Sequence, residues 1–220
     1  MDRRPLLTLA LILCVASVPA VAQATPTGLN NIPTADVVPK DVLVLQGFAN
    51  FDGDTSWFAG LKYGPTENLE VGVDDLFSGA GSATGPAFQA KYRLPPRHGA
   101  RLALGIANIT GDEDRDGDTF PYAVVSASLG EKRNGHLGYS VQEDNHALFL
   151  GADAAVSPRL TLRADWIQTN DGDESVSSLG FISPIADRFL IEGWASFPTA
   201  DGADNDYVIK VDFVVGRGNG

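Results

Sequence analysis

Between residues 42 and 214 the chain divides into about twelve short segments in which apolar and polar residues alternate. The clearest is 88–94, where Phe88, Ala90, Tyr92 and Leu94 alternate with Gln89, Lys91 and Arg93. Successive side chains of a β-strand point to opposite faces, so this period of two predicts strands with one apolar and one polar face. The predicted strands are 42–51, 56–63, 69–75, 88–94, 101–109, 122–129, 135–142, 147–156, 160–168, 175–183, 188–197 and 207–214.

The connections between these segments alternate between two classes. One class is compact and rich in turn-forming residues, and comprises 64–68, 95–100, 130–134, 157–159 and 183–187. The other comprises 52–55, 76–87, 110–121, 143–146, 169–174 and 198–206, and all but the second of these are markedly acidic. Bacterial outer-membrane barrels have short turns on one rim, longer loops on the other and an even strand number. The pattern therefore predicts an all-β, antiparallel, up-and-down transmembrane barrel.

The N-terminus has the three parts of a secretory signal peptide. Arg3 and Arg4 form the charged part, residues 6–18 the apolar part, and residues 19–24 a small-residue part. The apolar run is shorter than the ~20 residues of a membrane-spanning helix. We expect cleavage after the Ala22-Gln23-Ala24 sequence, with Ala20-Val21-Ala22 as the alternative. The only cysteine, Cys14, lies within this leader, so the exported domain is predicted to contain no disulfide.

The predicted organisation has four parts. Residues 1–24 are the signal peptide, and residues 25–41, rich in Pro, Thr and Asn without any period, are an extended segment before the first strand. Residues 42–214 form the barrel, and residues 215–220 are a C-terminal tail. The formal net charge is −12, and loss of the leader makes it more negative. Such a chain is repelled by phosphate, so a nucleic-acid partner is excluded.

Alternation does not by itself say which face of the barrel points inward. In a soluble lipocalin-type barrel the apolar face lines the interior and can bind a small apolar ligand. The strand number, the unequal rims and the aromatic residues near strand ends favour a membrane barrel instead. Those aromatic residues are Trp57, Tyr63, Tyr122, Trp166, Phe197 and Tyr207.

In a membrane barrel the polar face would line the lumen, where opposite charges on neighbouring strands can pair. A lumen crowded with paired side chains would be narrow or closed. The predicted luminal charges are Lys62, Glu70, Asp74, Lys91, Arg93, Arg101, Asp153, Arg163, Asp165, Lys210 and Asp212. The facing of the first, eighth and eleventh strands is left open by the sequence.

One acidic loop offers a candidate surface Ca²⁺ site, formed by Asp112, Asp114, Asp116 and Asp118. It lacks the glutamate and the helices of an EF-hand, so a solvated acidic loop is the competing interpretation. The three histidines, at positions 98, 136 and 146, have no metal-ligand spacing. The sequence sets apart no Ser, His and Asp combination. We therefore predict no catalytic residues, no other cofactor and no enzymatic activity.

The segment Gly28-Leu29-Asn30-Asn31-Ile32-Pro33-Thr34-Ala35-Asp36-Val37-Val38-Pro39 resembles the opening of YjbH-type outer-membrane barrels. That resemblance covers about a dozen residues together with the general strand pattern. It implies a barrel of that kind and a link to exopolysaccharide production or export.

Together these features predict a non-enzymatic barrel of the bacterial outer membrane, either a narrow pore or a structural component of the envelope. Its expected partners are outer-membrane lipid, the barrel assembly machinery as for other proteins of this class, and a polysaccharide or small solute. The alternative is the soluble exported barrel described above.

Overall fold

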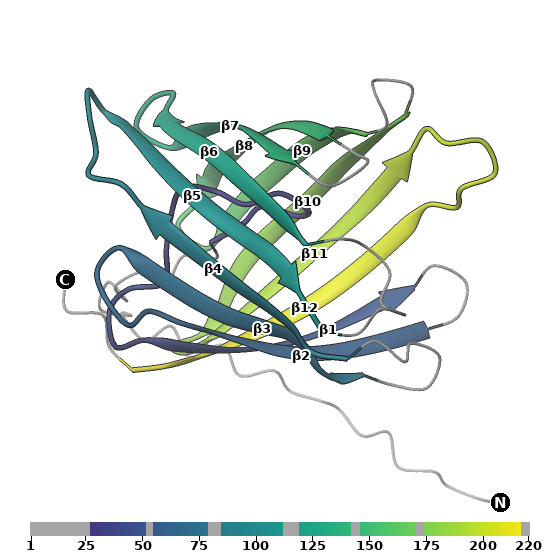
Figure 1. The fold of residues 1–220 in the computed structure, drawn as a ribbon, viewed down its shortest axis with the longest axis horizontal. Coiled ribbons are helices and arrows are strands. Elements are labelled where there is room, and N and C mark those ends of the chain that lie inside the picture. Colours follow the sequence, from purple (N-terminus) through teal and green to yellow (C-terminus); the bar gives the residue numbers. More distant parts are fainter. Residues whose placement is uncertain are drawn as a thin grey trace, which may run out of the picture.

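The computed structural model describes residues 27–51, 55–78, 85–111, 119–141, 146–169 and 174–216. Twelve antiparallel strands form one closed barrel in which each strand pairs with its neighbours in sequence and β1 pairs with β12 (Figure 1). This confirms the predicted fold class and strand number. The strands are β1 (Leu43–Phe51), β2 (Thr55–Tyr63), β3 (Leu69–Ser78), β4 (Ala87–Arg93), β5 (Ala100–Ile109), β6 (Phe120–Ser128), β7 (Arg133–Val141), β8 (His146–Ser157), β9 (Leu160–Thr169), β10 (Glu174–Ala186), β11 (Phe189–Pro198) and β12 (Asp206–Val215).

The two rims of the barrel differ in the length of their connections. One rim carries the short connections 64–68, 94–99, 129–132, 158–159 and 187–188. Leu43 at the start of β1 pairs with Val215 at the end of β12, so both ends of the barrel chain lie at this short-turn rim. Within the described ranges no helix has the length and hydropathy to span a bilayer.

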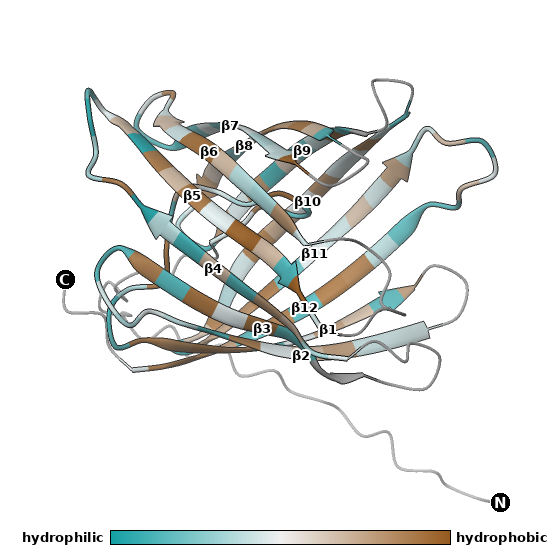
Figure 2. Ribbon diagram, viewed as in Figure 1, coloured by the Kyte–Doolittle hydropathy of each residue, from teal (hydrophilic) through white to brown (hydrophobic). Residues whose placement is uncertain are grey.

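The barrel is apolar outside and polar inside. Large apolar side chains such as Leu137, Leu150 and Leu179 are about half exposed on the exterior, and apolar and polar residues alternate along the strands (Figure 2). Glu70, Glu192 and Asp212 are at most 1% exposed. A soluble calyx needs the opposite arrangement, so that alternative is wrong. Water-excluding lipid around the exterior accounts for the exposed apolar surface.

The structure fixes the three strands whose facing the sequence leaves open. Gln46 on β1, Phe149 on β8 and Glu192 on β11 are all buried in the interior. The predicted position of one aromatic residue is wrong. Tyr122 is 8% exposed and packs in an interior apolar cluster, so it does not belong to an interfacial girdle.

Two strands, β3 and β10, extend three residues beyond their predicted C-terminal ends. β3 continues to Ser78 because Asp75 takes a left-handed conformation (φ 54°) and the pairing register with β2 shifts at this point. Short polar residues tolerate that conformation, and a bulge lets pairing resume beyond it. β10 continues through Pro184 to Ala186, again across a register shift. The predicted turns 76–87 and 183–187 are therefore shorter.

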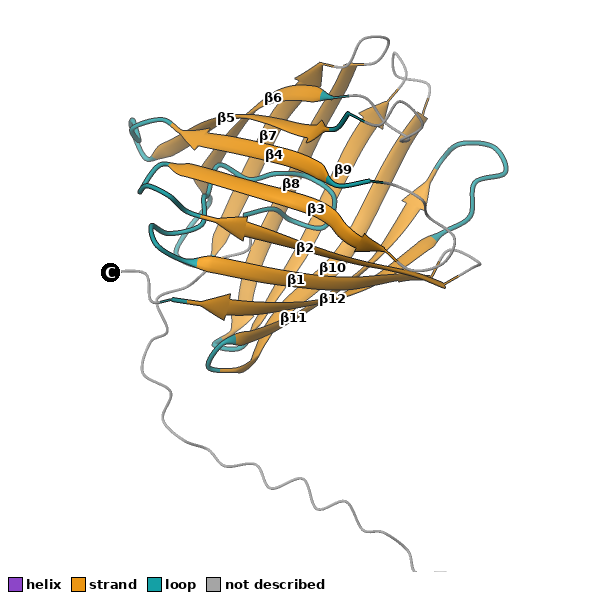
Figure 3. Cartoon of the chain, turned by 60° about the horizontal axis from the view of Figure 1, so that its bottom comes forward, coloured by secondary structure: helices purple, strands orange, loops and turns teal. Residues whose placement is uncertain are grey.

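The largest correction concerns the N-terminal segment. The sequence predicts an extended lead-in before the first strand over residues 25–41. Instead, residues 27–41 fold back into the barrel and cross its interior, as the purple segment in Figure 1 and the enclosed loop in Figure 3 show. Thr27, Ala35 and Val38 are at most 3% exposed. We refer to residues 27–41 as the luminal segment.

Candidate functional site

The first half of the luminal segment, residues 27–34, forms a small hairpin, which we call the luminal hairpin. Leu29 N–H donates to the Ile32 carbonyl (2.9 Å), and Thr34 N–H donates to the Thr27 carbonyl (3.2 Å). The tip is Asn30-Asn31, a residue type that favours turns. The hairpin thus satisfies part of its own backbone polarity and offers its side chains to the barrel wall.

Apolar contacts hold one side of the luminal hairpin. Leu29 and Ile32 lie in one buried cluster with Tyr122, Val124 and Phe149 of β6 and β8. Gly151 on β8 makes room for them. A Cβ at Gly151 would lie 2.5 Å from Leu29 Cδ1 and 2.8 Å from Ile32 Cδ1. This wall glycine therefore permits the close approach of the hairpin.

Hydrogen bonds from the next three strands around the barrel hold the hairpin tip. Asp165 Oδ2 on β9 accepts the backbone N–H of Asn30 (2.9 Å) and of Asn31 (3.3 Å). The Asn31 side-chain amide donates to Ser178 Oγ on β10 (2.7 Å) and to Ser196 Oγ on β11 (2.9 Å). The tip is therefore tied to three successive strands.

Not every polar group at the tip is satisfied. Asn30 Oδ1 and the Trp194 indole N–H are buried and make no hydrogen bond among the described residues. Asn30 Oδ1 and Trp194 Cβ both lie against Gly180. Burying an unpaired polar group costs about 1–3 kcal/mol, so docking of the tip is less favourable than its contacts alone suggest.

A second group of contacts holds the base of the hairpin against β3 and β4. Glu70 accepts the Thr27 hydroxyl (2.9 Å) and the Val38 N–H (2.8 Å), one with each carboxylate oxygen. Lys91 Nζ donates to the Thr27 carbonyl (2.6 Å) and lies 3.6 Å from Glu70 Oε1. Lys62 Nζ also reaches Thr27 Oγ1 (3.4 Å).

Between these groups, Ser126, His136 and Asp153 form a hydrogen-bonded chain. Ser126 Oγ lies 2.7 Å from His136 Nδ1, and His136 Nε2 lies 2.9 Å from Asp153 Oδ2. These are the residue types of a hydrolase triad. However, Ser126 is fully buried and its Oγ accepts the Ala35 N–H (2.9 Å), so no substrate carbonyl reaches it in this conformation. The chain anchors the luminal segment.

The luminal segment leaves the lumen at the short-turn rim. Asp36 pairs with Arg101 on β5 (2.9 Å), a half-buried contact. Lys40 forms an isolated backbone β-bridge with Gly64. Asp41 takes a left-handed conformation (φ 61°) where the chain turns into β1. Asp41 is therefore the corner between the luminal segment and the barrel.

The wall formed by β9, β11, β12 and β1 carries a set of charges that pair with one another. Arg163 contacts Glu192, and Lys210 Nζ lies 2.9 Å from Glu192 Oε1 and 3.6 Å from Asp212 Oδ1. Gln46 donates to Asp212 (3.0 Å). We call Arg163, Glu192, Lys210 and Asp212 the charge cluster. Each of these contacts lies within the barrel wall.

The other predicted luminal charges have separate partners. Asp74 accepts a hydrogen bond from Gln89, while Arg93 donates to the Glu67 carbonyl near the short-turn rim (2.8 Å). The candidate Ca²⁺ ligands at 112, 114, 116 and 118 lie outside the described residues, so that site stays a prediction. Within the described ranges no group of three or more His, Cys, Asp or Glu residues is arranged to hold a metal ion.

Sequence reasoning names most of the charged wall residues but misses the luminal hairpin. It also misses the wall serines that bind the luminal segment and the histidine beside one of them, which are Ser126, Ser178, Ser196 and His136. One signal was available. Leu29, Ile32, Val37 and Val38 give an apparently exposed lead-in an apolar content that solvent would not favour.

No protein-family model and no curated protein matches this chain. Solved structures do resemble it. The KdgM porin has a TM-score of 0.64 at 9% identity, covering 77% of this chain and 98% of its own. The NanC porin has a TM-score of 0.61 at 11% identity (78% and 98%). An outer membrane channel from Pseudomonas putida F1 has a TM-score of 0.55 at 12% identity (82% and 98%). At these identities the likeness shows the fold. Together with the apolar exterior, this fold is that of a bacterial outer-membrane β-barrel.

Proposed function

We propose that the protein is an outer-membrane channel for small solutes and that its own luminal hairpin closes it. The observation that carries the proposal is the position of this hairpin. It crosses the lumen and bonds to Asp165, Ser178 and Ser196 at its tip and to Glu70 and Lys91 at its base. A segment with contacts to walls on both sides blocks passage while it is docked.

Four features support opening by movement of the hairpin. It is joined to the barrel by non-covalent contacts and by one chain connection at Asp41. Its tip buries the unpaired polar groups of Asn30 and Trp194. The charge cluster pairs within the wall, so the barrel retains these ion pairs when the hairpin leaves. The closed strand ladder likewise does not depend on the hairpin.

The charges of the lumen favour small neutral or zwitterionic solutes. Basic and acidic side chains are mixed on the wall and largely paired, so neither sign of charge dominates. The formal net charge of the whole chain is −12, which disfavours entry of a polyanion by long-range repulsion.

A link to saccharides is the narrower form of this proposal. The segment containing the hairpin resembles the opening of YjbH-type barrels, and a structure of the KdgM porin contains disordered oligogalacturonate. A short neutral oligosaccharide fits the mixed lumen better than an acidic one. Insertion by the barrel assembly machinery is part of the proposal as a property of this class of protein.

Conductance across planar bilayers tests the proposal. The leader contains the only cysteine, so the mature chain can carry one engineered pair, Asn31→Cys with Ser178→Cys, at the 2.7 Å contact between the hairpin tip and β10. We expect low conductance when the pair is oxidised and increased opening after reduction. The two single-cysteine variants are the matched controls and should not respond to reductant.

The class of solute is tested with the reduced form of the double-cysteine variant. Neutral and acidic oligosaccharides of equal length are compared as blockers of its current. Preferential block by the neutral sugar is expected, and equal or stronger block by the acidic one would remove the assignment of solute class. A barrel that stays impermeable with the tip released, and also with Asp165→Ala, is not a channel. A structural role in the envelope would then be the better description.

A further inference from the structure

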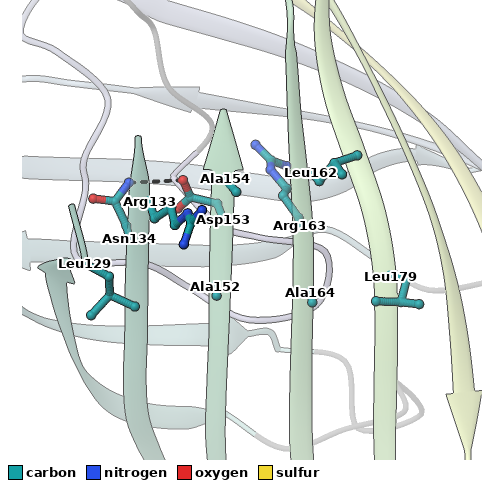
Figure 4. Close-up of a pocket in the computed structure, with 10 residues that line it drawn as sticks. All are labelled: Leu129, Arg133, Asn134, Ala152, Asp153, Ala154, Leu162, Arg163, Ala164 and Leu179. Carbon is teal, nitrogen blue, oxygen red and sulfur yellow. Dashed lines mark hydrogen bonds between the residues drawn. The ribbon is translucent and has the colours of Figure 1, made fainter. Parts of the chain in front are cut away.

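The exterior of the barrel carries an apolar groove that the channel function does not use. It spans β7 to β10 and has a volume of about 280 Å³. Ala152 and Ala164 are cross-strand partners and form its floor, with Leu179 next in the same row (Figure 4). Leu129, Leu162 and Leu179 border it and are 65%, 47% and 62% exposed. Arg163, which neighbours Leu162, is buried on the opposite face, so these leucines point into the membrane.

The groove ends at a basic residue on the short-turn rim. Arg133, the first residue of β7, lines it and is exposed. Its guanidinium has no ion-pair partner in the described part of the chain. Lys132 and Arg159 lie in the two short turns beside it, with Glu131 as the one acidic residue there. In an outer-membrane barrel this rim faces the periplasm, at the level of phospholipid headgroups.

We propose that this groove is a binding site for one anionic phospholipid of the periplasmic leaflet. The acyl chain would lie over the alanine floor between the leucines, where burial of apolar surface is favourable. Its phosphate would accept hydrogen bonds from Arg133, whose planar fork matches that group.

A second copy of the protein fits this groove less well. A copy would present the same apolar exterior, and burying the Arg133 guanidinium against it without a carboxylate is costly. A phospholipid supplies both the apolar chain and the compensating negative charge. The site does not depend on whether the barrel conducts.

Native mass spectrometry of the full mature protein in mixed micelles tests the site. Phosphatidylglycerol is the anionic probe and phosphatidylcholine the zwitterionic one. We expect one retained phosphatidylglycerol, and about tenfold weaker retention in Arg133→Gln, as for loss of a hydrogen bond to a charged group. Ala164→Leu, which fills the groove, should lower retention of both lipids.

Two variants are matched controls. Arg97→Gln removes a basic side chain from a different short turn, and Ala90→Leu enlarges an outward residue on β4. Both should retain phosphatidylglycerol as the unchanged protein does. Heat-modifiable mobility on gels checks that every variant is folded.

Equal retention of phosphatidylglycerol by all variants would overturn the proposal. So would displacement of the lipid by soluble glycerol phosphate, because the acyl chain would then contribute nothing. Retention that falls in Arg133→Gln and Ala164→Leu but not in the controls supports it.

Discussion

Two walls of the lumen carry similar charged residues but use them differently. On β9, β11 and β12 the charge cluster pairs within the wall, through Arg163–Glu192 and Lys210–Glu192 contacts. On β3 and β4, Glu70 and Lys91 also pair with each other, but each makes a further hydrogen bond to Thr27 of the hairpin. Charge alone does not distinguish these walls. The charge cluster differs from the Glu70–Lys91 pair in that its contacts lie within the barrel, whereas the pair also binds the luminal segment.

This difference separates the stability of the barrel from the docking of the hairpin. Contacts within the wall stabilise the barrel whether or not the hairpin is docked. In the proposed channel, contacts to the hairpin set the equilibrium between the closed and the open lumen. Substitutions in the charge cluster should therefore lower mainly the free energy of unfolding. Substitutions at the hairpin contacts should change mainly the conductance.

The largest effect is expected for Glu192→Leu. It leaves Arg163 and Lys210 buried with one carboxylate fewer, and breaking a buried ion pair costs about 3–5 kcal/mol. The free energy of unfolding, from denaturant titrations in detergent, should fall by that amount. The double variant Glu192→Leu with Lys210→Met should recover part of the loss. A stable Glu192→Leu protein with altered conductance alone would contradict the assignment of this wall.

The next effect is expected for Asp165→Ala at the hairpin tip. Asp165 accepts two backbone N–H groups, and each hydrogen bond to a charged group contributes about 1.5–3 kcal/mol. The open fraction in planar bilayers should rise at least tenfold, while unfolding of the barrel changes less than in Glu192→Leu. Unchanged conductance would show that the tip does not control closure.

A steric substitution tests the same equilibrium from the apolar side. Gly151→Leu places side-chain atoms where Leu29 and Ile32 pack, and overfilling of this kind costs about 1–3 kcal/mol. We expect increased conductance. Gly47→Leu is the control, since a Cβ at Gly47 meets nothing within 4 Å. A similar rise in both variants would mean that leucine acts through the barrel rather than through the hairpin.

The smallest effect is expected for Arg101→Gln. The Asp36–Arg101 pair is about 30% exposed at each side chain, and pairs of this kind contribute about 0–1 kcal/mol. A slight rise in conductance that disappears at high salt is expected, because salt screens the pair in the unchanged protein too. A rise in conductance as large as that in Asp165→Ala would show that the main anchor of the luminal segment is the Asp36–Arg101 pair at the rim and not the hairpin tip.

Much of the barrel could be predicted from the sequence because its strands follow a local rule. The alternation from Phe88 to Leu94 is enough to place β4 and its two faces. The ends of strands were less accurate where an unusual conformation intervenes, as at Asp75, since a bulge is not visible in an alternating pattern.

The site was predicted only in part, for a different physical reason. Glu70 and Lys91 are conspicuous as charges in strands, but their partner Thr27 is an ordinary polar residue in a segment without periodicity. Asn31 and Ser196 are 165 positions apart, and no local pattern joins them. The hairpin is specified by contacts with the barrel around it, so no local sequence pattern predicts it.

The long separation between the hairpin tip and its partners has a consequence for the order of assembly. Asn30 and Asn31 are translated before all twelve strands, whereas Asp165, Ser178 and Ser196 belong to three of the last four strands. These contacts can form only after β9, β10 and β11 are in place. Contacts of the same segment with Glu70, Lys91 and Ser126 involve earlier strands, so the segment can dock in two stages, first at its base and last at its tip.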